Sequence, residues 1–172
     1  TPGWTLVFLP LGLAVWQVAE YGIHRFAFHW EGVGPVTRKL HHIIHGYHHL
    51  YPDDPLRLVM PLGASLPLAV LLGLLLWSFG VPQATVPFFS GFVLAYLGYD
   101  FFHWFVHAYK PKAGWARSMH VHHMVHHFKN PDANFGISHR WVDRVVGTLD
   151  EGRGPAREPA PRREGPGSEI VN

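Results

Sequence analysis

The sequence contains no cysteine among its 172 residues. That absence excludes a disulfide framework and any zinc or iron–sulfur site held by thiolates. The chain also lacks a Rossmann glycine fingerprint and a P-loop, so no nucleotide-binding motif is indicated. Its net charge of +2 is too small to favour a nucleic-acid partner. Any metal site must therefore be built from histidine, aspartate or glutamate.

Lysine and arginine are missing from residues 1–24 and 58–109, and the apolar runs lie in these two windows. Leu58–Phe79 has 22 residues without a charge, and as a helix it would be roughly 33 Å long, enough to cross a bilayer. Trp4–Tyr21 and Val86–Val106 are also apolar, and the first lacks the basic start and cleavage site of a signal peptide. The three runs predict an all-α integral membrane fold rather than a soluble protein with buried core helices.

The charge distribution predicts which side of the membrane each segment occupies. If each run spans the membrane, residues 22–57 and 107–172 lie on one side and residues 80–85 on the other. Every lysine and arginine lies on the first side, and residues 80–85 contain none. The positive-inside rule makes that side the cytoplasm. Residues 151–172 are rich in proline, glycine and mixed charge, which is typical of disorder. We expect a membrane domain over 1–150, a disordered tail over 151–172, and a location in a bacterial inner membrane, or in the ER membrane if the protein is eukaryotic.

Histidine is abundant, with 15 residues gathered mainly in "HRFAFH", "HHIIHGYHH", "HWFVH" and "HVHHMVHH". These four stretches sit at or just beyond the cytoplasmic ends of the apolar runs. Imidazole is the commonest protein metal ligand, and residues three or four apart share a helix face. One ion takes about four to six ligands, so ten imidazoles imply two metals. The spacings HxxxxH, HxxHH, HxxxH and HxxHH supply these ten: His24, His29, His45, His48, His49, His103, His107, His123, His126 and His127.

The ligand type limits the identity of the metal. Nitrogen-rich sites suit zinc, copper, iron or nickel, and a structural zinc would be closed by four ligands. Two metals at the ends of apolar helices favour O₂ activation against an apolar substrate, and hence two iron ions, although zinc can replace iron in a purified sample. Asp100 lies three residues before His103 in an apolar run. We expect Asp100, and similarly Tyr99, to orient an imidazole by accepting its second N–H, the alternative being a carboxylate in interfacial water.

The order of the four histidine stretches resembles the fatty acid hydroxylase superfamily of membrane di-metal enzymes, and most closely the fatty acid 2-hydroxylases. The similarity is carried by "EYGIHRFAFH", "HGYHHLYPDDPLRLVMP", "GYDFFHWFVH" and "HHFKNPDANFGIS". Of these, "DDPLRLVMP" is the most discriminating, and the resemblance covers roughly residues 15–149. It implies that the ten histidines hold two irons beneath a cytosolic helical cap. It leaves His41, His42, His120 and His122 outside the ligand pattern, although helical geometry alone would accept His41 and His42.

The resemblance implies O₂-dependent hydroxylation of a lipid acyl chain, at C2 of a fatty acid or of the N-acyl chain of a ceramide-like lipid. Eukaryotic members often carry a fused cytochrome b5 domain, which is absent from these residues, so we expect a separate cytochrome b5- or ferredoxin-like electron donor. One alternative is a sterol or carotenoid hydroxylase or desaturase of the same superfamily. A different class is a His-rich membrane metal-binding or transport protein, which favours ligands strung across the membrane. A zinc hydrolase would want an acidic base as in HExxH, and none is present.

Overall fold

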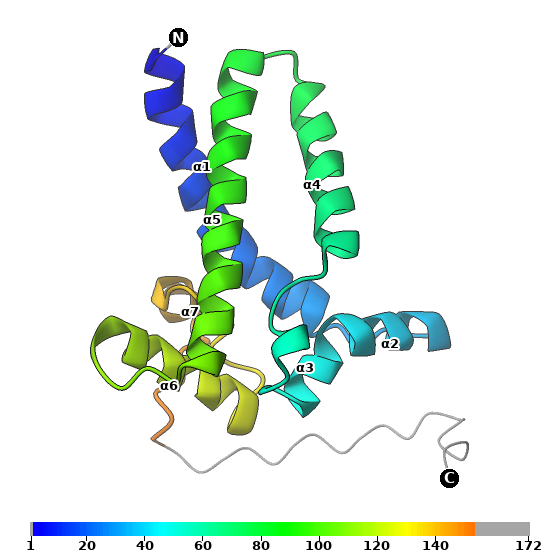
Figure 1. Ribbon diagram of the computed structural model, residues 1–172, viewed down its shortest axis with the longest axis vertical. Coiled ribbons are helices and arrows are strands. Elements are labelled where there is room, and N and C mark those ends of the chain that lie inside the picture. The colour runs from blue at the N-terminus through cyan, green and yellow to red at the C-terminus, as the bar shows by residue number, and fades with distance from the viewer. Residues whose placement is uncertain (1, 154–172) are drawn as a thin grey trace.

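The computed structural model describes residues 2–153, and all regular elements within this range are helical. Three long helices dominate one half of the molecule (Figure 1): α1 (Pro2–Gly22), α4 (Leu62–Trp77) and α5 (Pro82–Ala108). Each belongs to a stretch long and apolar enough to cross a membrane. The predicted all-α fold with three membrane helices is confirmed. Apart from residues 151–153, the predicted tail lies outside the described residues.

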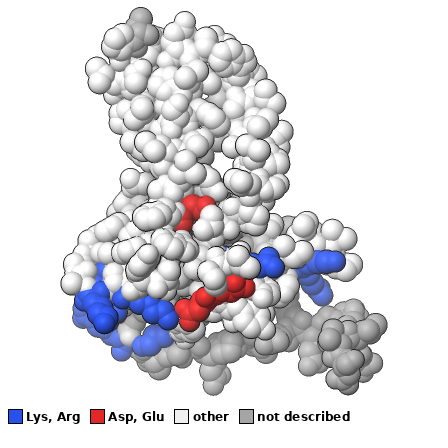
Figure 2. All heavy atoms as spheres, in the orientation of Figure 1, with Lys and Arg blue, Asp and Glu red and all other residues white. Residues whose placement is uncertain are grey.

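Shorter helices form a cap at one end of the long ones (Figure 1). The helix α1 runs down into the cap, α4 leads away from it, and α5 returns to it. Figure 2 shows lysine and arginine over the cap and none on the visible face of the long helices. Residues 22–57 and 107–153, the described parts of the segments predicted to share a side, therefore lie at the same end. The cap elements are η1 (Ile23–Phe28), α2 (Pro35–His41), η2 (His42–Gly46), α3 (Tyr47–Leu50), η3 (Pro55–Arg57), α6 (Gly114–Phe128) and α7 (Trp141–Val146).

The predicted boundaries of two membrane helices are wrong by several residues. The helix α4 begins at Leu62, not at Leu58, and the preceding segment is irregular with Leu58 buried in it. Asp100 holds this segment, because its Oδ1 accepts a hydrogen bond from the Met60 N–H at 3.2 Å. The helix α5 begins earlier than predicted, at Pro82, and proline is favourable in a first helical turn. Hydropathy indicates which residues suit a membrane, but it does not locate the start of a helix.

Glycines let α1 and α5 approach closely. A Cβ atom on Gly12 would lie 2.1 Å from the Phe88 carbonyl oxygen, and one on Gly91 would lie 2.1 Å from the Leu9 carbonyl oxygen. Small residues have this role at helix contacts in membranes, where backbones must come together to gain van der Waals contact. The two helices form a close pair, and each carries histidines into the cap.

We expect Gly91→Ala to destabilise the protein by about 1–3 kcal/mol, because the new methyl group overlaps backbone that has no room to move. Thermal unfolding in detergent measures this as a lower midpoint. Gly98→Ala is the matched control in the same helix, since a Cβ atom there meets nothing within 4 Å. Equal midpoints for the two variants would contradict the close α1–α5 contact.

Candidate metal centre

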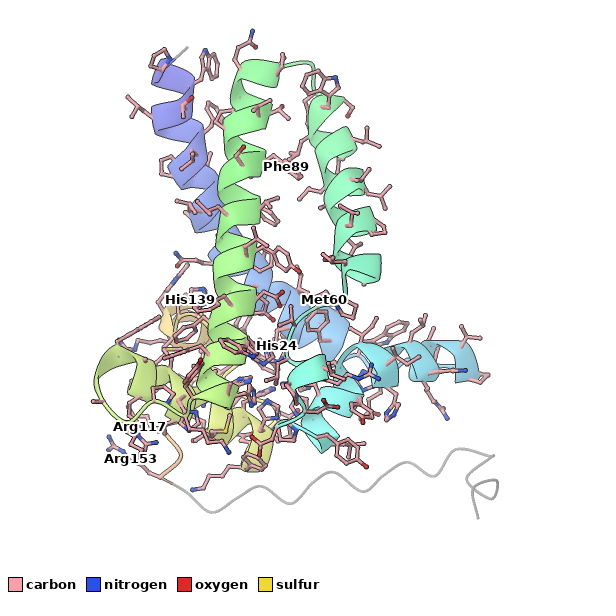
Figure 3. The ribbon with its side chains drawn as sticks, viewed as in Figure 1. His24, Met60, Phe89, Arg117, His139 and Arg153 are labelled. Carbon is pink, nitrogen blue, oxygen red and sulfur yellow. The ribbon has the colours of Figure 1, made fainter. Side chains whose placement is uncertain are left out.

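The ten predicted histidines come together at the cap end of α1 and α5, in the region of His24 in Figure 3. They form two groups of five, and within each group the possible ligand atoms all lie within 4.8 Å of one another. Both groups combine segments that are far apart in the sequence. The first histidine group is His24, His29, His45, His49 and His126, and the second is His48, His103, His107, His123 and His127.

A π-helical turn explains the spacing HxxxxH. On an α-helix, residues five apart are separated by about 140° and do not share a face. Residues Ile23–Phe28 are instead π-helical, and the His29 N–H donates to the His24 carbonyl oxygen at 3.2 Å. This wider turn brings both rings into the first group, with centroids 5.1 Å apart. Such turns are rare and often mark functional sites.

Each HxxHH motif divides its three rings between the two groups. His45 and His49 belong to the first group, whereas His48, between them in sequence, belongs to the second. In α6 the assignment is reversed, since His123 and His127 lie in the second group and His126 in the first. Residues four apart share a helix face more closely than residues three apart, which turns the middle ring toward the neighbouring group. The two motifs therefore connect the two groups symmetrically.

The nitrogen spacing within each group fits a shared metal ion. Four Nε2 atoms of the first group lie at the corners of a quadrilateral whose sides measure 2.9–3.2 Å: those of His29, His45, His49 and His126. In the second group, the His123 Nε2 lies 2.9–3.1 Å from the Nε2 atoms of its three neighbours His103, His107 and His127. Two nitrogens bound at right angles to one metal are ~3.0 Å apart when each metal–nitrogen bond is ~2.1 Å.

Burial keeps these rings neutral. It lowers the pKa of His48 and His49 to about 3, with further lowering by neighbouring histidines. Burial likewise lowers the pKa of His29 to about 4 and the pKa of His123 well below its usual value. Neutral imidazole is the form that binds metal, so no proton has to be displaced at neutral pH.

Hydrogen bonds fix the tautomers of His24 and His126, with the proton on Nδ1 and none on Nε2. His24 donates from Nδ1 to the Phe135 carbonyl oxygen at 2.6 Å, and His126 donates from Nδ1 to the Ala133 carbonyl oxygen at 2.7 Å. A neutral ring has only one N–H, so both Nε2 atoms present lone pairs to the other rings. A cation between them removes the repulsion between facing lone pairs. The nitrogen-only donor set therefore fits zinc, copper, iron or nickel.

The prediction that the Asp100 carboxylate accepts an N–H from an imidazole is wrong. The carboxylate accepts from the Met60 N–H and not from an imidazole. The neighbouring Leu58 backbone is hydrogen-bonded to His103 of the second group, so Asp100 acts on that ring through the segment it holds. Tyr99 lies against His103 in a stacked arrangement, with centroids 6.1 Å apart.

The four histidines outside the pattern occupy different surroundings. The Nδ1–H group of His120 donates a hydrogen bond to the Val106 carbonyl oxygen at 2.7 Å. His122 lies 3.3 Å from Asp143, and both side chains are fully buried. His41 is half-buried and His42 is exposed, and neither belongs to a histidine group.

We expect acid to destabilise the protein. An unfolded histidine titrates near pH 6.5, whereas His29, His48 and His49 have folded pKa values of about 4, 3 and 3. Between these values the unfolded state binds more protons, so stability is full above pH 6.5 and falls as the pH falls toward 3. The thermal midpoint should drop from pH 7 to pH 5. Exposed His42 provides the control: His42→Asn should leave the profile unchanged, and a midpoint independent of pH would contradict the account.

Residues 9–148 match the family model described as fatty acid hydroxylase. The chain belongs to the fatty acid hydroxylase family. It is 35% identical over 138 residues to a dihydroceramide fatty acyl 2-hydroxylase of Arabidopsis thaliana, covering 80% of this chain and 58% of that protein. It is 37% identical over 150 residues to the fatty acid 2-hydroxylase of Rattus norvegicus, covering 81% and 38%.

A solved structure has the same fold as this hydroxylase-family chain. It is described as full-length scs7p with only the hydroxylase domain visible, and it matches with a TM-score of 0.82 and 30% identity. The match covers 92% of this chain and 61% of that one. The chain thus spans about three fifths, or less, of the relatives it matches. Its three helices that are long and apolar enough to cross a bilayer support an integral membrane protein.

Proposed function

We propose that this protein hydroxylates a lipid acyl chain at C2, in a fatty acid or in the N-acyl chain of a ceramide-like lipid. The observation that carries the proposal is an apolar cavity that adjoins a smaller cavity lined by histidines of both groups. The apolar cavity measures about 660 Å³ and lies between the membrane helices and the cap. Its volume falls within the range of ligand sites in proteins. Its lining includes Leu68 and Leu72 of α4, Phe89 and Phe92 of α5, and Trp16 of α1.

A second, smaller cavity adjoins the first one on the side of the histidines. It measures about 50 Å³ and is lined by His45 of the first group and by His48 and His103 of the second. Four lining residues belong to both cavities: Phe28, Ile44, Met60 and Tyr99. In Figure 3, Phe89 lies beside α5 at the level of the long helices, whereas Met60 and His24 lie lower, nearer the cap. An acyl tail in the large cavity would therefore have its head end beside both groups.

This arrangement favours oxidation near the head of the lipid. A membrane lipid keeps its polar head at the interface and its tail in the apolar layer. The histidine groups lie at the cap end of the cavity, and the polar side chains of Tyr99 and Asp100 line the small cavity there. C2 is the first chain carbon after the carbonyl carbon, so it would reach the histidines when the tail fills the cavity. A site that oxidised the tail end would require the opposite placement.

The residues of this chain would bind the metal ions, orient the acyl chain and exclude water from the site. Burial keeps the imidazoles neutral and ready to bind metal, and the apolar lining orients the chain and excludes water. Two bound iron ions would supply the O₂ activation that hydroxylation of an unactivated C–H bond requires. One oxygen atom enters the C–H bond as hydroxyl, and the other leaves as water. Two electrons come from a separate donor protein of the cytochrome b5 or ferredoxin kind, and two protons come from solvent. The charged cap faces the cytoplasm by the positive-inside rule.

The alternatives fit less well. A transport protein would place ligands along a path across the membrane, whereas the ten histidines gather at one end of the long helices among the described residues. The named relatives are fatty acid and dihydroceramide hydroxylases, which favours an acyl chain over a sterol or a carotenoid.

The proposal is tested by lipid profiling. The chain is produced in membranes together with a reductase system, and extracted lipids are compared by mass spectrometry with those from membranes carrying His48→Ala. The expected result is acyl chains that gain one oxygen at C2 with the unchanged protein only. Oxidised sterols or carotenoids would identify the alternative substrate, and no oxidised lipid despite tight metal binding would favour a metal-binding role.

A further inference from the structure

The loop of residues 133–138, between α6 and α7, contacts ligands of the first histidine group. Its Ala133 carbonyl accepts the Nδ1 proton of His126, and its Phe135 carbonyl accepts that of His24. The Phe135 ring also lies edge-on to the ring of His29, with centroids 5.4 Å apart. All three histidines belong to the first group.

Two buried carboxylates hold the backbone of this loop. Asp143 accepts the N–H groups of residues 135 and 136, both at 2.9 Å. Glu20 of α1 accepts those of residues 137 and 138, at 2.7 and 2.8 Å. The two acidic residues are 0% and 2% exposed. Four consecutive peptide N–H groups are thus fixed from two different helices, which sets the direction of the carbonyl groups between them.

A carbonyl partner on Nδ1 matters for metal binding. It fixes the tautomer whose Nε2 lone pair is available, holds the ring in one orientation and raises the basicity of Nε2. Loss of such a partner typically costs about 10–100-fold in metal affinity. The second histidine group uses other supports, such as the Leu58 backbone beside His103. The two groups therefore depend on different parts of the chain.

We propose that Glu20 and Asp143 are positioning residues that act through the 133–138 loop on His24 and His126 and strengthen metal binding by the first histidine group alone. The inference rests on the proposed two-metal centre. It makes the two metal positions unequal, because each has its own supporting residues.

Amide variants test the proposal. Asp143→Asn keeps the shape of the side chain but replaces one accepting oxygen by an NH₂ group that faces the N–H of residue 135 or of residue 136. Glu20→Gln also keeps the shape and removes the negative charge of the group whose Oε1 accepts the N–H groups of residues 137 and 138. Metal content of the full chain is measured by elemental analysis during titration with a chelator. We expect two ions in the unchanged protein, and in each variant one ion held as before and one held about 10–100-fold more weakly. Asp53→Asn is the control, because Asp53 is exposed and forms an ion pair with Lys110 away from both histidine groups. This variant should keep both ions.

The site is identified by combining variants. With His29→Ala, which already disrupts the first group, Asp143→Asn should cause no further loss. With His107→Ala, which disrupts the second group, it should weaken the ion that remains. A purely structural role would reduce binding equally in both backgrounds, and that result would overturn the proposal.

The outcomes separate the inference from the proposed function. An unchanged protein that binds no metal contradicts the two-metal centre itself. Two ions held with unchanged affinity in both amide variants leave the centre intact and overturn only the role of Glu20 and Asp143. If Asp143→Asn does not fold, Glu20→Gln decides, because it perturbs the same loop from a different helix.

Discussion

His29→Ala and His107→Ala are each expected to leave one bound metal ion per chain and to abolish hydroxylation. The reason is the division of the ligands, since His29 lies in the first histidine group and His107 in the second. Each variant removes one nitrogen from one five-nitrogen set and leaves the other set complete. Activity is lost in both because the proposed reaction needs two metals acting together. Elemental analysis of purified protein and lipid mass spectrometry on the same preparation measure the two effects.

The control for this pair is His42→Ala, which removes an exposed imidazole outside both groups. It should keep two ions and full activity. Two ions retained by His29→Ala or by His107→Ala, together with undiminished activity, would show that the corresponding group is not a metal site.

Met60→Trp is expected to abolish hydroxylation while both metal ions remain bound. Met60 lines the large apolar cavity and the small cavity beside the histidines, so a larger side chain there closes the connection between tail and metal centre. It belongs to neither histidine group, and its backbone bond to Asp100 does not involve the side chain. The measurement is hydroxylated product formed per bound metal.

Met60→Leu is the matched variant, since it conserves volume and such exchanges usually cost little. It should retain most of the activity. Normal product formation by Met60→Trp would place the substrate path elsewhere, whereas loss of metal from that variant would point to a structural effect of the substitution.

The four histidine spacings in the sequence predict the ten ligands, and their number predicts two ions because it exceeds what a single ion can bind. It does not predict how they divide. The pair His24 and His29 is five residues apart, and only a π-helical turn brings both rings to one group. Spacing rules derived from α-helices cannot anticipate that turn. The same rules predict one shared face for "HHIIHGYHH", whereas the structure directs its rings to two groups and leaves two of them outside.

The supporting carboxylates are harder to predict, because they meet their partners across the fold. Glu20 and the Ile137 N–H are 117 positions apart in sequence, and no local pattern connects them. Asp100 is noticeable in the sequence as a carboxylate in an apolar run. Its actual partner, the Met60 N–H, depends on an irregular segment where hydropathy predicts a helix.

The proposed reaction is hydroxylation of an acyl chain at C2, at a centre where the two histidine groups would each hold one metal ion. The most direct measurement supplies the purified, iron-loaded chain with an electron donor, a long-chain acyl lipid and ¹⁸O₂, and locates the label in the product by fragmentation mass spectrometry. The account predicts one ¹⁸O atom at C2, dependent on His29 and on His107. Product without ¹⁸O, or label at another carbon, would contradict it.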